Sequence, residues 1–266
     1  MAASIEPGEL VCYPDDTPKG RNTAMSIETA VTQQRPVRFP HRRNISKASI
    51  PPLEAGDRLS RVKFERYYEA HPEIKKAELV EGVVQLPSPV HFKEHGEPHA
   101  WVVGWLTVYV AATPQVRLGD NTTVRLDLEN EVQPDAFLRL EPTHGGQSRV
   151  TVDDYLEGPP ELVVEVTGSR ASFDLNAKKR VYQRCGVQEY LALQIYEERV
   201  DWFVLREDVF DTLTPDAEGV VRSEAFPGLW LQPESLWSGD LATMLAVLQH
   251  GIGSDQHAAF VARLDR

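Results

Sequence analysis

A mixed α/β (α+β) fold, with a central mixed sheet flanked by helices, is the class that this sequence of 266 residues predicts. Strand-like apolar stretches dominate the middle of the chain, and helix-like stretches lie before and after them. Hydrophobic residues make up 41% of the chain and charged residues 26%, values that exclude disorder as the main state. The chain is therefore long enough and apolar enough to bury a sizeable core.

The first half of the chain predicts two helices, a hairpin and a loop. In order, they are a helix that begins near Ser60, a hairpin over residues 77–86, a loop over 87–99 and a buried helix over 100–112. Ser60 can cap the first helix, which Pro72 then stops. The pair Glu81-Gly82 suits a tight turn between two strands, and Pro114 follows the end of the buried helix.

The second half predicts the strands of the sheet and a set of closing helices. The expected strands are residues 122–128, 135–140, 161–167, 189–195 and 199–205. A helix over 173–185 should end at Gly186, because glycine is a natural residue just after a helix. Prolines and glycines make residues 213–237 rich in turns, and helices are expected over 240–250 and 255–264.

Charge divides the chain into a basic N-terminal segment and an acidic remainder. The net charge of −12 argues against a polybasic nucleic-acid binder, although an enzyme could still meet nucleic acid through a local basic site. Residues 1–50 carry more basic than acidic side chains, several prolines and little periodicity, which predicts a flexible arm. Two alternatives remain open: a basic tether to phosphate backbones, and a true start of the chain at Met25.

The cellular compartment is predicted from the cysteines and from the absence of targeting patterns. Cys12 and Cys185 are too few for a disulfide framework or a four-cysteine zinc site, so a reducing cytosol is expected. No apolar stretch reaches the length of a membrane span, and the first residues lack the pattern of a signal peptide. The expected location is therefore cytoplasmic, with no membrane partner.

Glu165 stands in the middle of the apolar strand ELVVEVT, which has apolar residues on both faces. A buried carboxylate is costly unless a cation, a metal ion or hydrogen bonds compensate it. The functional interpretation is favoured, and the alternative is that Glu165 pairs with an arginine or faces solvent. Asp135, after Pro134, opens another apolar strand, and Glu78 begins the hairpin; each is ambiguous by itself.

Taken together, these acids and a lysine occur in a recognisable order. The stretches that carry it are ELVEG (78–82), QPDAFL (133–138), PELVVEV (160–166), DLNAKKRVY (174–182) and GVQEYL (186–191). Over residues 58–206 the chain resembles the Uma2 family (DUF820) of restriction-endonuclease-like proteins, within the PD-(D/E)XK nuclease superfamily. The resemblance implies a restriction-endonuclease-like core, with a central mixed sheet and acids gathered at one edge.

The resemblance also implies roles for four residues. Asp135 and Glu165 would be the principal ligands of Mg²⁺, with Mn²⁺ as an alternative ion, since hard cations prefer carboxylate oxygens. Glu78 would be an additional ligand or would hold a water molecule. Lys178 would assist the base or stabilise the phosphate. The superfamily places its lysine two residues after the strand acid, where this chain has Thr167, whereas the Uma2 pattern has a lysine on the following helix.

Helical spacing predicts where this lysine points. Lys178, Val181, Tyr182 and Cys185 share one side of the helix, which should face the sheet, while Lys179 should point more towards solvent. Replacement of Lys178 by alanine is expected to abolish cleavage and to leave the fold intact.

The histidines suggest a different kind of site. His91, His95 and His99 recur every four residues and could bind zinc on one helix, but Gly96 and Pro98 interrupt any helix there. A zinc site is therefore disfavoured. The resemblance places a histidine shortly before the buried helix, a position that His99 fits best.

The function expected from these observations is a Mg²⁺-dependent endonuclease that hydrolyses DNA phosphodiester bonds. The alternative is a non-catalytic module on the same fold that binds nucleic acid or a protein. DNA is the expected partner, and a homodimer is the assembly that nucleases cutting both strands often use. The expected organisation is the arm over residues 1–50, a Uma2-like domain over 51–210, and an extension over 211–266 packed on the core or on a partner subunit.

Overall fold

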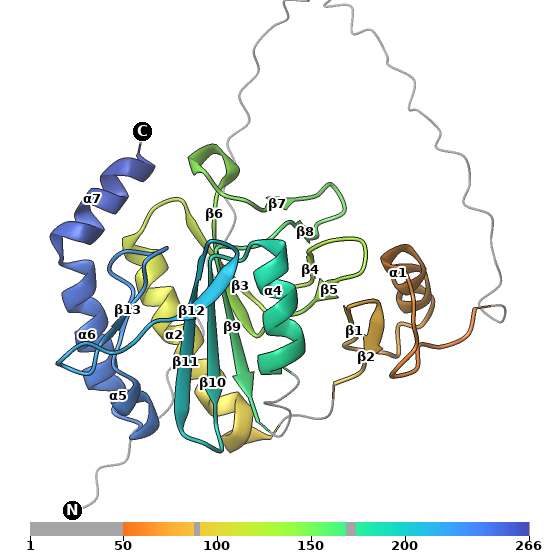
Figure 1. Cartoon of the computed structure of the whole chain (residues 1–266), viewed down its shortest axis with the longest axis horizontal. Coiled ribbons are helices and arrows are strands. Elements are labelled where there is room, and N and C mark those ends of the chain that lie inside the picture. The colour runs from red at the N-terminus through yellow and green to blue at the C-terminus, as the bar shows by residue number, and fades with distance from the viewer. Residues whose placement is uncertain (1–49, 88–90, 169–173, 266) are drawn as a thin grey trace, which may run out of the picture. The chain divides into compact units, whose positions relative to one another are not determined.

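The computed structural model describes residues 50–87, 91–168 and 174–265 of the chain. A six-stranded sheet lies at its centre, in the order β12-β11-β10-β9-β6-β3 (Figure 1). Strands β9 and β10 pair in parallel, and the other neighbours in this sheet pair antiparallel. The sheet is therefore mixed, and the predicted α+β class is confirmed.

The elements have the following bounds. The helical elements are α1 (Arg61–Ala70), η2 (Phe92–Gly96), α2 (Glu97–Ala112), η3 (Pro142–His144), η4 (Asp174–Lys178), α4 (Lys179–Cys185), α5 (Pro233–Trp237), α6 (Leu241–Ile252) and α7 (Asp255–Leu264). The strands of the central sheet are β3 (Val116–Asp120), β6 (Ala136–Leu140), β9 (Leu162–Thr167), β10 (Glu189–Gln194), β11 (Arg199–Arg206) and β12 (Val209–Thr212). The remaining strands are β1 (Glu78–Val80), β2 (Val83–Gln85), β4 (Val124–Arg125), β5 (Glu131–Val132), β7 (Arg149–Val150), β8 (Leu156–Glu157), β13 (Val221–Arg222) and β14 (Trp230–Leu231).

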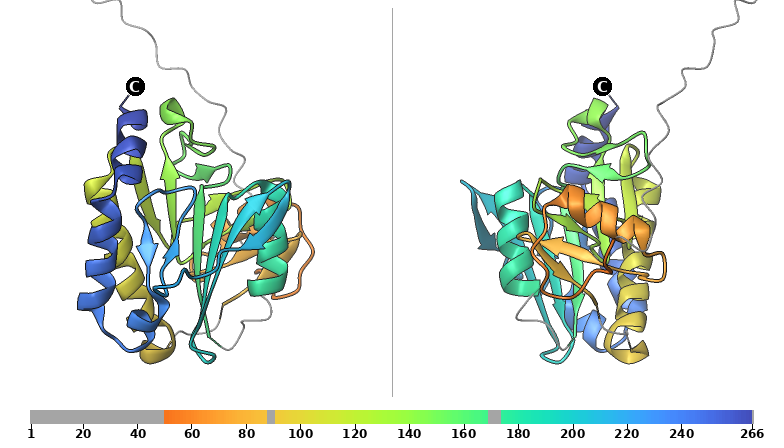
Figure 2. Two further views of the ribbon diagram at one scale, coloured as in Figure 1. Left: turned by 60° about the vertical axis from the view of Figure 1, so that its left-hand side comes forward. Right: turned by 90° about the vertical axis from the view of Figure 1, so that its right-hand side faces the viewer.

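Helices cover both faces of the central sheet, which explains why its inner strands read as continuous apolar runs (Figure 2). All six residues of β9 and all six of β10 are buried. Alternate residues of β9 face opposite layers: Val164 packs in the cluster that contains Trp105 of α2, and Val163 in the cluster that contains Val181 of α4. Glu165, the one acid in β9, points to the same side as Val163 and therefore lies between the sheet and α4.

A second six-stranded sheet, in the order β2-β1-β5-β4-β8-β7, was not predicted as a separate layer. Its first two strands form the expected hairpin, in which Glu81 and Gly82 have φ values of 51° and 72°. Positive φ at both central residues is the signature of the type I′ turn, whose twist suits a two-residue hairpin. Helix α1 packs on this sheet through Phe64, which lies in a cluster with Leu79 and Val84.

The predicted loop over residues 87–99 is wrong for its second half, because η2 and α2 occupy residues 92–112 as consecutive helical elements. Pro98 stands in the first turn of α2, where the backbone N–H that proline lacks has no partner within the helix. Pro98 therefore lies at the start of α2 and does not break it.

Strand β3 was missed, and the predicted strand 122–128 shrinks to the two residues of β4. Gly119 interrupts the alternation of apolar and polar residues that predicts a strand, and glycine is itself unfavourable in strands. It pairs with Phe137 of β6, and a Cβ atom at Gly119 would lie 2.0 Å from the Phe137 ring. The Phe137 ring thus lies directly over Gly119. Any residue with a Cβ atom at this position would force the ring to move.

The C-terminal helices pack on the same side of the central sheet as α2 (Figure 2). Met244 and Leu248 of α6 are buried in one cluster with Trp105, whose indole N–H donates to the Trp230 carbonyl. Glu189 of β10 links this segment to the sheet by hydrogen bonds. Its carboxylate accepts from the Ser223 hydroxyl and from the backbone N–H groups of Glu224 and Ala225. The C-terminal segment, as far as residue 265, therefore shares the main hydrophobic core.

Two further sequence predictions concern the N-terminal arm and the absence of a membrane span. The flexible arm and the alternative start at Met25 fall within residues 1–49, outside the described residues. Of the helices that the structure describes, none combines the length and hydrophobicity that a membrane span requires.

A buried carboxylate, Glu131 of β5, links the second sheet to α1. It is 3% exposed and lies beside Glu65 of α1 and Arg125 of β4. The Arg125 Nε atom is 2.8 Å from Glu65 Oε1 but 3.9 Å from Glu131 Oε2, so the cation is shared unequally. Burial, together with the neighbouring Glu65 carboxylate, raises the pKa of Glu131 to about 8.

Replacement of Glu131 by glutamine is therefore expected to weaken the pH dependence of stability. The folded protein keeps a proton on Glu131 up to a pKa of about 8, whereas the ordinary value is 4.5. This proton stabilises the fold below about pH 4.5, and the contribution is lost as the pH rises through 8. Urea denaturation at pH 5.5 and 8.5 should show the native protein losing about 1–3 kcal/mol more than Glu131→Gln. Equal losses would contradict the assignment.

Candidate active site

The centre of the candidate site is Lys178, which bridges two glutamates from distant parts of the chain. Its Nζ atom lies 3.0 Å from Glu78 Oε1 and 3.0 Å from Glu165 Oε1. All three side chains are buried, with exposed fractions of 4–6%. Ion pairs this far from water are strong only when geometry and further hydrogen bonds compensate the desolvation of both partners. The lysine therefore supplies the cation that the buried strand acid required.

Local structure explains how Lys178 reaches these acids. It is the last residue of the π-helical turn η4 and directly precedes α4. Val181 and Tyr182, one turn later, are fully buried against the sheet, so the i+3/i+4 face turns Lys178 inward as the spacing predicts. Lys179 is half-buried, and its Nζ atom lies 3.3 Å from the centroid of the Phe203 ring. Lys179 thus rests on the sheet instead of extending freely into solvent.

Glu78 and Tyr182 add hydrogen bonds around the lysine. Glu78 begins β1, and its Oε1 atom also accepts from the Gln133 backbone N–H at 2.7 Å. The Tyr182 hydroxyl donates to Glu165 Oε1 at 2.6 Å. Burial and the two nearby glutamates raise the pKa of Tyr182 well above its usual value, so the phenol stays protonated and remains a donor.

Asp135 lies opposite Glu165 across two antiparallel strands. Residue Ala136 of β6 pairs with Val164 of β9, and one further step of this register brings Asp135 opposite Glu165. Opposed residues of an antiparallel pair point to the same face of the sheet. Asp135 Oδ2 accepts from the Val166 N–H at 2.7 Å, which fixes the carboxylate against β9. Three acids and one lysine are thus brought together on the α4 side of the sheet.

His95 is a neighbour of Asp135 that the sequence argument did not place in the site. Its Nδ1 atom lies 3.2 Å from the Val166 carbonyl, and its Nε2 atom lies 3.5 Å from Asp135 Oδ1. Because a carbonyl can only accept, Nδ1 carries the proton in this contact. His99, the histidine expected from the resemblance, instead meets the Asp135 backbone carbonyl at 3.0 Å and Asp120 Oδ1 at 2.9 Å.

The two histidines stack, with ring centroids 5.4 Å apart, so η2 and α2 present them side by side. The signal in the sequence that could identify His95 is its i, i+4 spacing to His99, which places both rings on one helical face because Pro98 lies in the first turn of α2. Within the described ranges, no group of three His, Cys, Asp or Glu side chains is arranged to hold a metal ion. The described residues therefore give no support to a zinc site at His91, His95 and His99.

The donor chemistry fits a hard cation held by two carboxylates. Mg²⁺ is commonly bound by one or two carboxylates and keeps several waters, so a cluster of three is not required. Asp135 and Glu165 lie on the same side of the central sheet, whereas Glu78 belongs to the second sheet. One oxygen of each glutamate already accepts two hydrogen bonds: Glu78 Oε1 from Lys178 and Gln133, and Glu165 Oε1 from Lys178 and Tyr182.

Thr167, two residues after Glu165, makes a contact within the sheet. The Thr167 hydroxyl donates to the Leu193 carbonyl of β10 at 2.9 Å, which joins the two parallel strands. The amine comes from η4 instead and reaches Glu165, two residues earlier in the same strand. The amine that contacts Glu165 thus comes from a helical element that packs on the sheet, and not from β9 itself.

Comparison with known proteins establishes the family. A family model described as "Putative restriction endonuclease" matches residues 62–234, more than half of the chain, and the chain therefore belongs to the Uma2 family. The match extends past the predicted limit at residue 206 and ends within the first turn of α5. None of the curated proteins matches the chain.

A solved structure is also similar in fold. It is described as the "crystal structure of a putative nuclease belonging to DUF820" from Anabaena variabilis ATCC 29413. The two chains are 15% identical, the similarity covers 61% of this chain and 89% of the other, and the TM-score is 0.46.

Proposed function

We propose that this protein is a metal-dependent nuclease that hydrolyses phosphodiester bonds of DNA. Membership of a family described as "Putative restriction endonuclease" supports the nuclease class. The observation that carries the proposal is the position of Lys178, 3.0 Å from Glu165 and on the same side of the sheet as Asp135. A buried amine beside opposed carboxylates is suited to binding a phosphate oxygen next to a cation.

Each residue has a distinct role in this proposal. Asp135 and Glu165 would hold Mg²⁺ or Mn²⁺, which supplies a bound water of lowered pKa and neutralises charge on the phosphate. Lys178 donates to the phosphate oxygen or orients the attacking water. Glu78 positions Lys178 through their ion pair, and the Tyr182 hydroxyl orients the Glu165 carboxylate.

A non-catalytic binding module is the competing function, and one observation favours it. Lys178 already compensates Glu78 and Glu165, so the buried acids are neutralised in part without a metal ion. A cation would then have to enter a site that is stable without it.

Nicking of supercoiled plasmid separates the two functions. Wild-type protein with Mg²⁺ or Mn²⁺ should convert the plasmid to open-circular or linear DNA, and EDTA should stop the reaction. The Asp135→Ala variant serves as the control for a contaminating nuclease. Absence of any metal-dependent cleavage, together with DNA binding, would support the binding module instead.

A further inference from the structure

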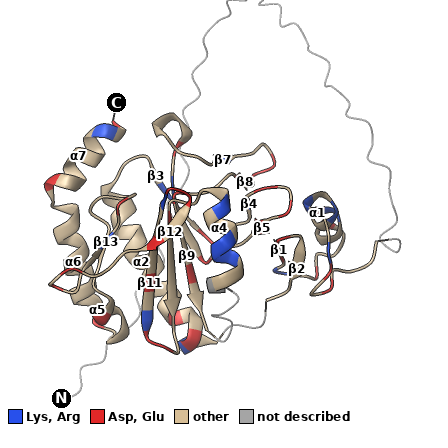
Figure 3. Cartoon of the chain, in the orientation of Figure 1, with Lys and Arg blue, Asp and Glu red and all other residues tan. Residues whose placement is uncertain are grey.

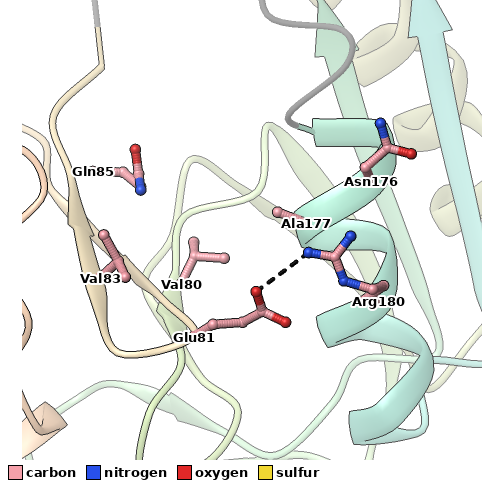
Figure 4. Close-up of a pocket in the computed structure, with 7 residues that line it drawn as sticks. All are labelled: Val80, Glu81, Val83, Gln85, Asn176, Ala177 and Arg180. Atoms are coloured by element: carbon pink, nitrogen blue, oxygen red, sulfur yellow. Dashed lines mark hydrogen bonds and ion pairs between the residues drawn. The ribbon is translucent and has the colours of Figure 1, made fainter.

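A cavity of about 400 Å³ lies between the β1–β2 hairpin and the η4–α4 helix, directly beside the candidate site (Figure 4). Its lining residues are Val80, Glu81, Val83, Gln85, Asn176, Ala177 and Arg180. Val80 follows Glu78 by two residues on the same face of β1, and Ala177 directly precedes Lys178. The ion pair between Glu78 and Lys178 thus joins the two elements that form the walls.

The walls combine an aliphatic interior with a few polar groups. Val80, Val83 and Ala177 supply the apolar surface, and the Gln85 side chain extends from the hairpin into the gap (Figure 4). An amide carries both donors and an acceptor, so Gln85 can meet either kind of hydrogen-bonding edge. The volume is within the range of about 300–1,000 Å³ that small-molecule sites occupy. A flat ring with a polar edge, such as a nucleobase, matches this lining.

A strip of basic side chains borders the cavity. Arg180 and Arg184 lie on α4, where basic residues are concentrated (Figure 3). Both are more than half exposed, and they pair with Glu81 at 3.3 and 3.7 Å. Exposed ion pairs contribute little to stability, so a phosphate can replace Glu81 as the partner of Arg180 at low cost. In a chain of net charge −12, this strip offers a local place for a nucleic-acid backbone.

We propose that this cavity holds one unpaired nucleobase of a DNA strand, with Arg180 on the adjacent phosphate. The inference rests on the nuclease function proposed above and deepens it, because it names the class of substrate. A base in the cavity must leave the duplex stack, and this costs least where the nucleotide is already unpaired. The favoured substrate is therefore DNA with an overhang, a flap or a single-stranded segment beside the bond that is cleaved.

Binding without divalent metal ions tests the proposal independently of cleavage. Full-length protein in EDTA is titrated against a blunt hairpin duplex and the same duplex with a short overhang that contains 2-aminopurine. Anisotropy should show about tenfold tighter binding of the overhang. The fluorescence of 2-aminopurine should rise as the base leaves its stacked neighbours for an aliphatic pocket. Equal affinity for both duplexes would overturn the proposal.

Variants with matched controls locate the binding to this cavity. Val83→Trp fills the cavity and should remove the tenfold preference, while Val209→Trp, at an exposed valine of β12, should keep it. Arg180→Ala should weaken binding and lower the salt dependence by about one phosphate contact. Arg206→Ala should leave both the affinity and the salt dependence unchanged, because Arg206 is also more than half exposed and pairs with Glu224, outside the cavity. Glu81→Gln frees Arg180 and should tighten binding about threefold.

The outcomes distinguish this proposal from the nuclease function. Metal-dependent cleavage without a preference for overhangs would reject the cavity and keep the nuclease. A preference that Val83→Trp removes, with no cleavage under any metal, would keep the cavity as a binding site and reject the nuclease. A preference that survives in Val83→Trp would place the unpaired base elsewhere and overturn the inference.

Discussion

Replacement of Lys178 by alanine is expected to lower the free energy of unfolding by about 3–5 kcal/mol. The change leaves the buried carboxylates of Glu78 and Glu165 without their shared cation, and an unpaired buried charge is strongly destabilising. For a chain of this size, the expected loss in Tm is roughly 6–20 °C. Thermal denaturation followed by circular dichroism measures it. The variant is therefore expected to keep its fold at moderate temperature, with a smaller margin of stability.

Cleavage should fall by a factor on the order of 10²–10³ in the same variant, measured at a temperature where it is still folded. Lys179→Ala is the matched control, because Lys179 stacks on Phe203 and its removal should cost no more than about 1 kcal/mol. The double variant Lys178→Ala, Glu78→Gln should recover part of the stability, since one of the unpaired charges is gone. A Lys178→Ala protein as stable and active as wild type would refute the role given to the ion pairs.

Asp135→Asn is expected to abolish metal binding while it keeps the fold. The amide oxygen can still accept from the Val166 N–H, so the contact at 2.7 Å survives. Wild-type protein should gain about 2.7 kcal/mol of stability when the metal concentration reaches one hundred times Kd. The variant should lose this gain, because the charge that attracts the cation is removed. The Tm measured with and without Mg²⁺ or Mn²⁺ reports the difference.

Plasmid cleavage by Asp135→Asn should fall by about 10³ or more if the metal ion activates the water. Asp120→Asn is a suitable control, because Asp120 contacts His99 but is half exposed and lies on β3, which β6 separates from β9. A metal-dependent rise in Tm that is the same in Asp135→Asn and in wild type would assign the cation to another site.

The buried strand acid was a useful signal for the site but not a specific one. Glu189 is completely buried in the equally apolar strand EYLALQ, yet its partners are the Ser223 hydroxyl, the Trp202 indole and backbone N–H groups. Glu161 is likewise satisfied by the backbone N–H of Leu140. Only Glu165 among these three is compensated by a lysine. The partner, and not the burial, separates the candidate site from structural acids.

Local pattern was sufficient for most helices and for the inner strands, because their residues are selected by burial on one or two faces. The first helix, the hairpin at Glu81-Gly82 and the stop at Gly186 all lie where the sequence places them. Edge strand β3 and the start of α2 were missed, since their hydrophobic pattern is interrupted by Gly119 and Pro98. The Phe137 ring of β6 covers Gly119, and Pro98 is tolerated because it lies in the first turn of its helix.

The residues alone are sufficient to identify the family, the order of Glu78, Asp135, Glu165 and Lys178, and the inward face of the helix that carries the lysine. The three-dimensional fold was needed to show that the lysine bridges two glutamates and that His95 lies beside the Asp135 carboxylate. The reason is physical. Periodicity reports which side of an element is buried, whereas the pairing of charges 100 residues apart depends on strand register and on how a helix seats against the sheet.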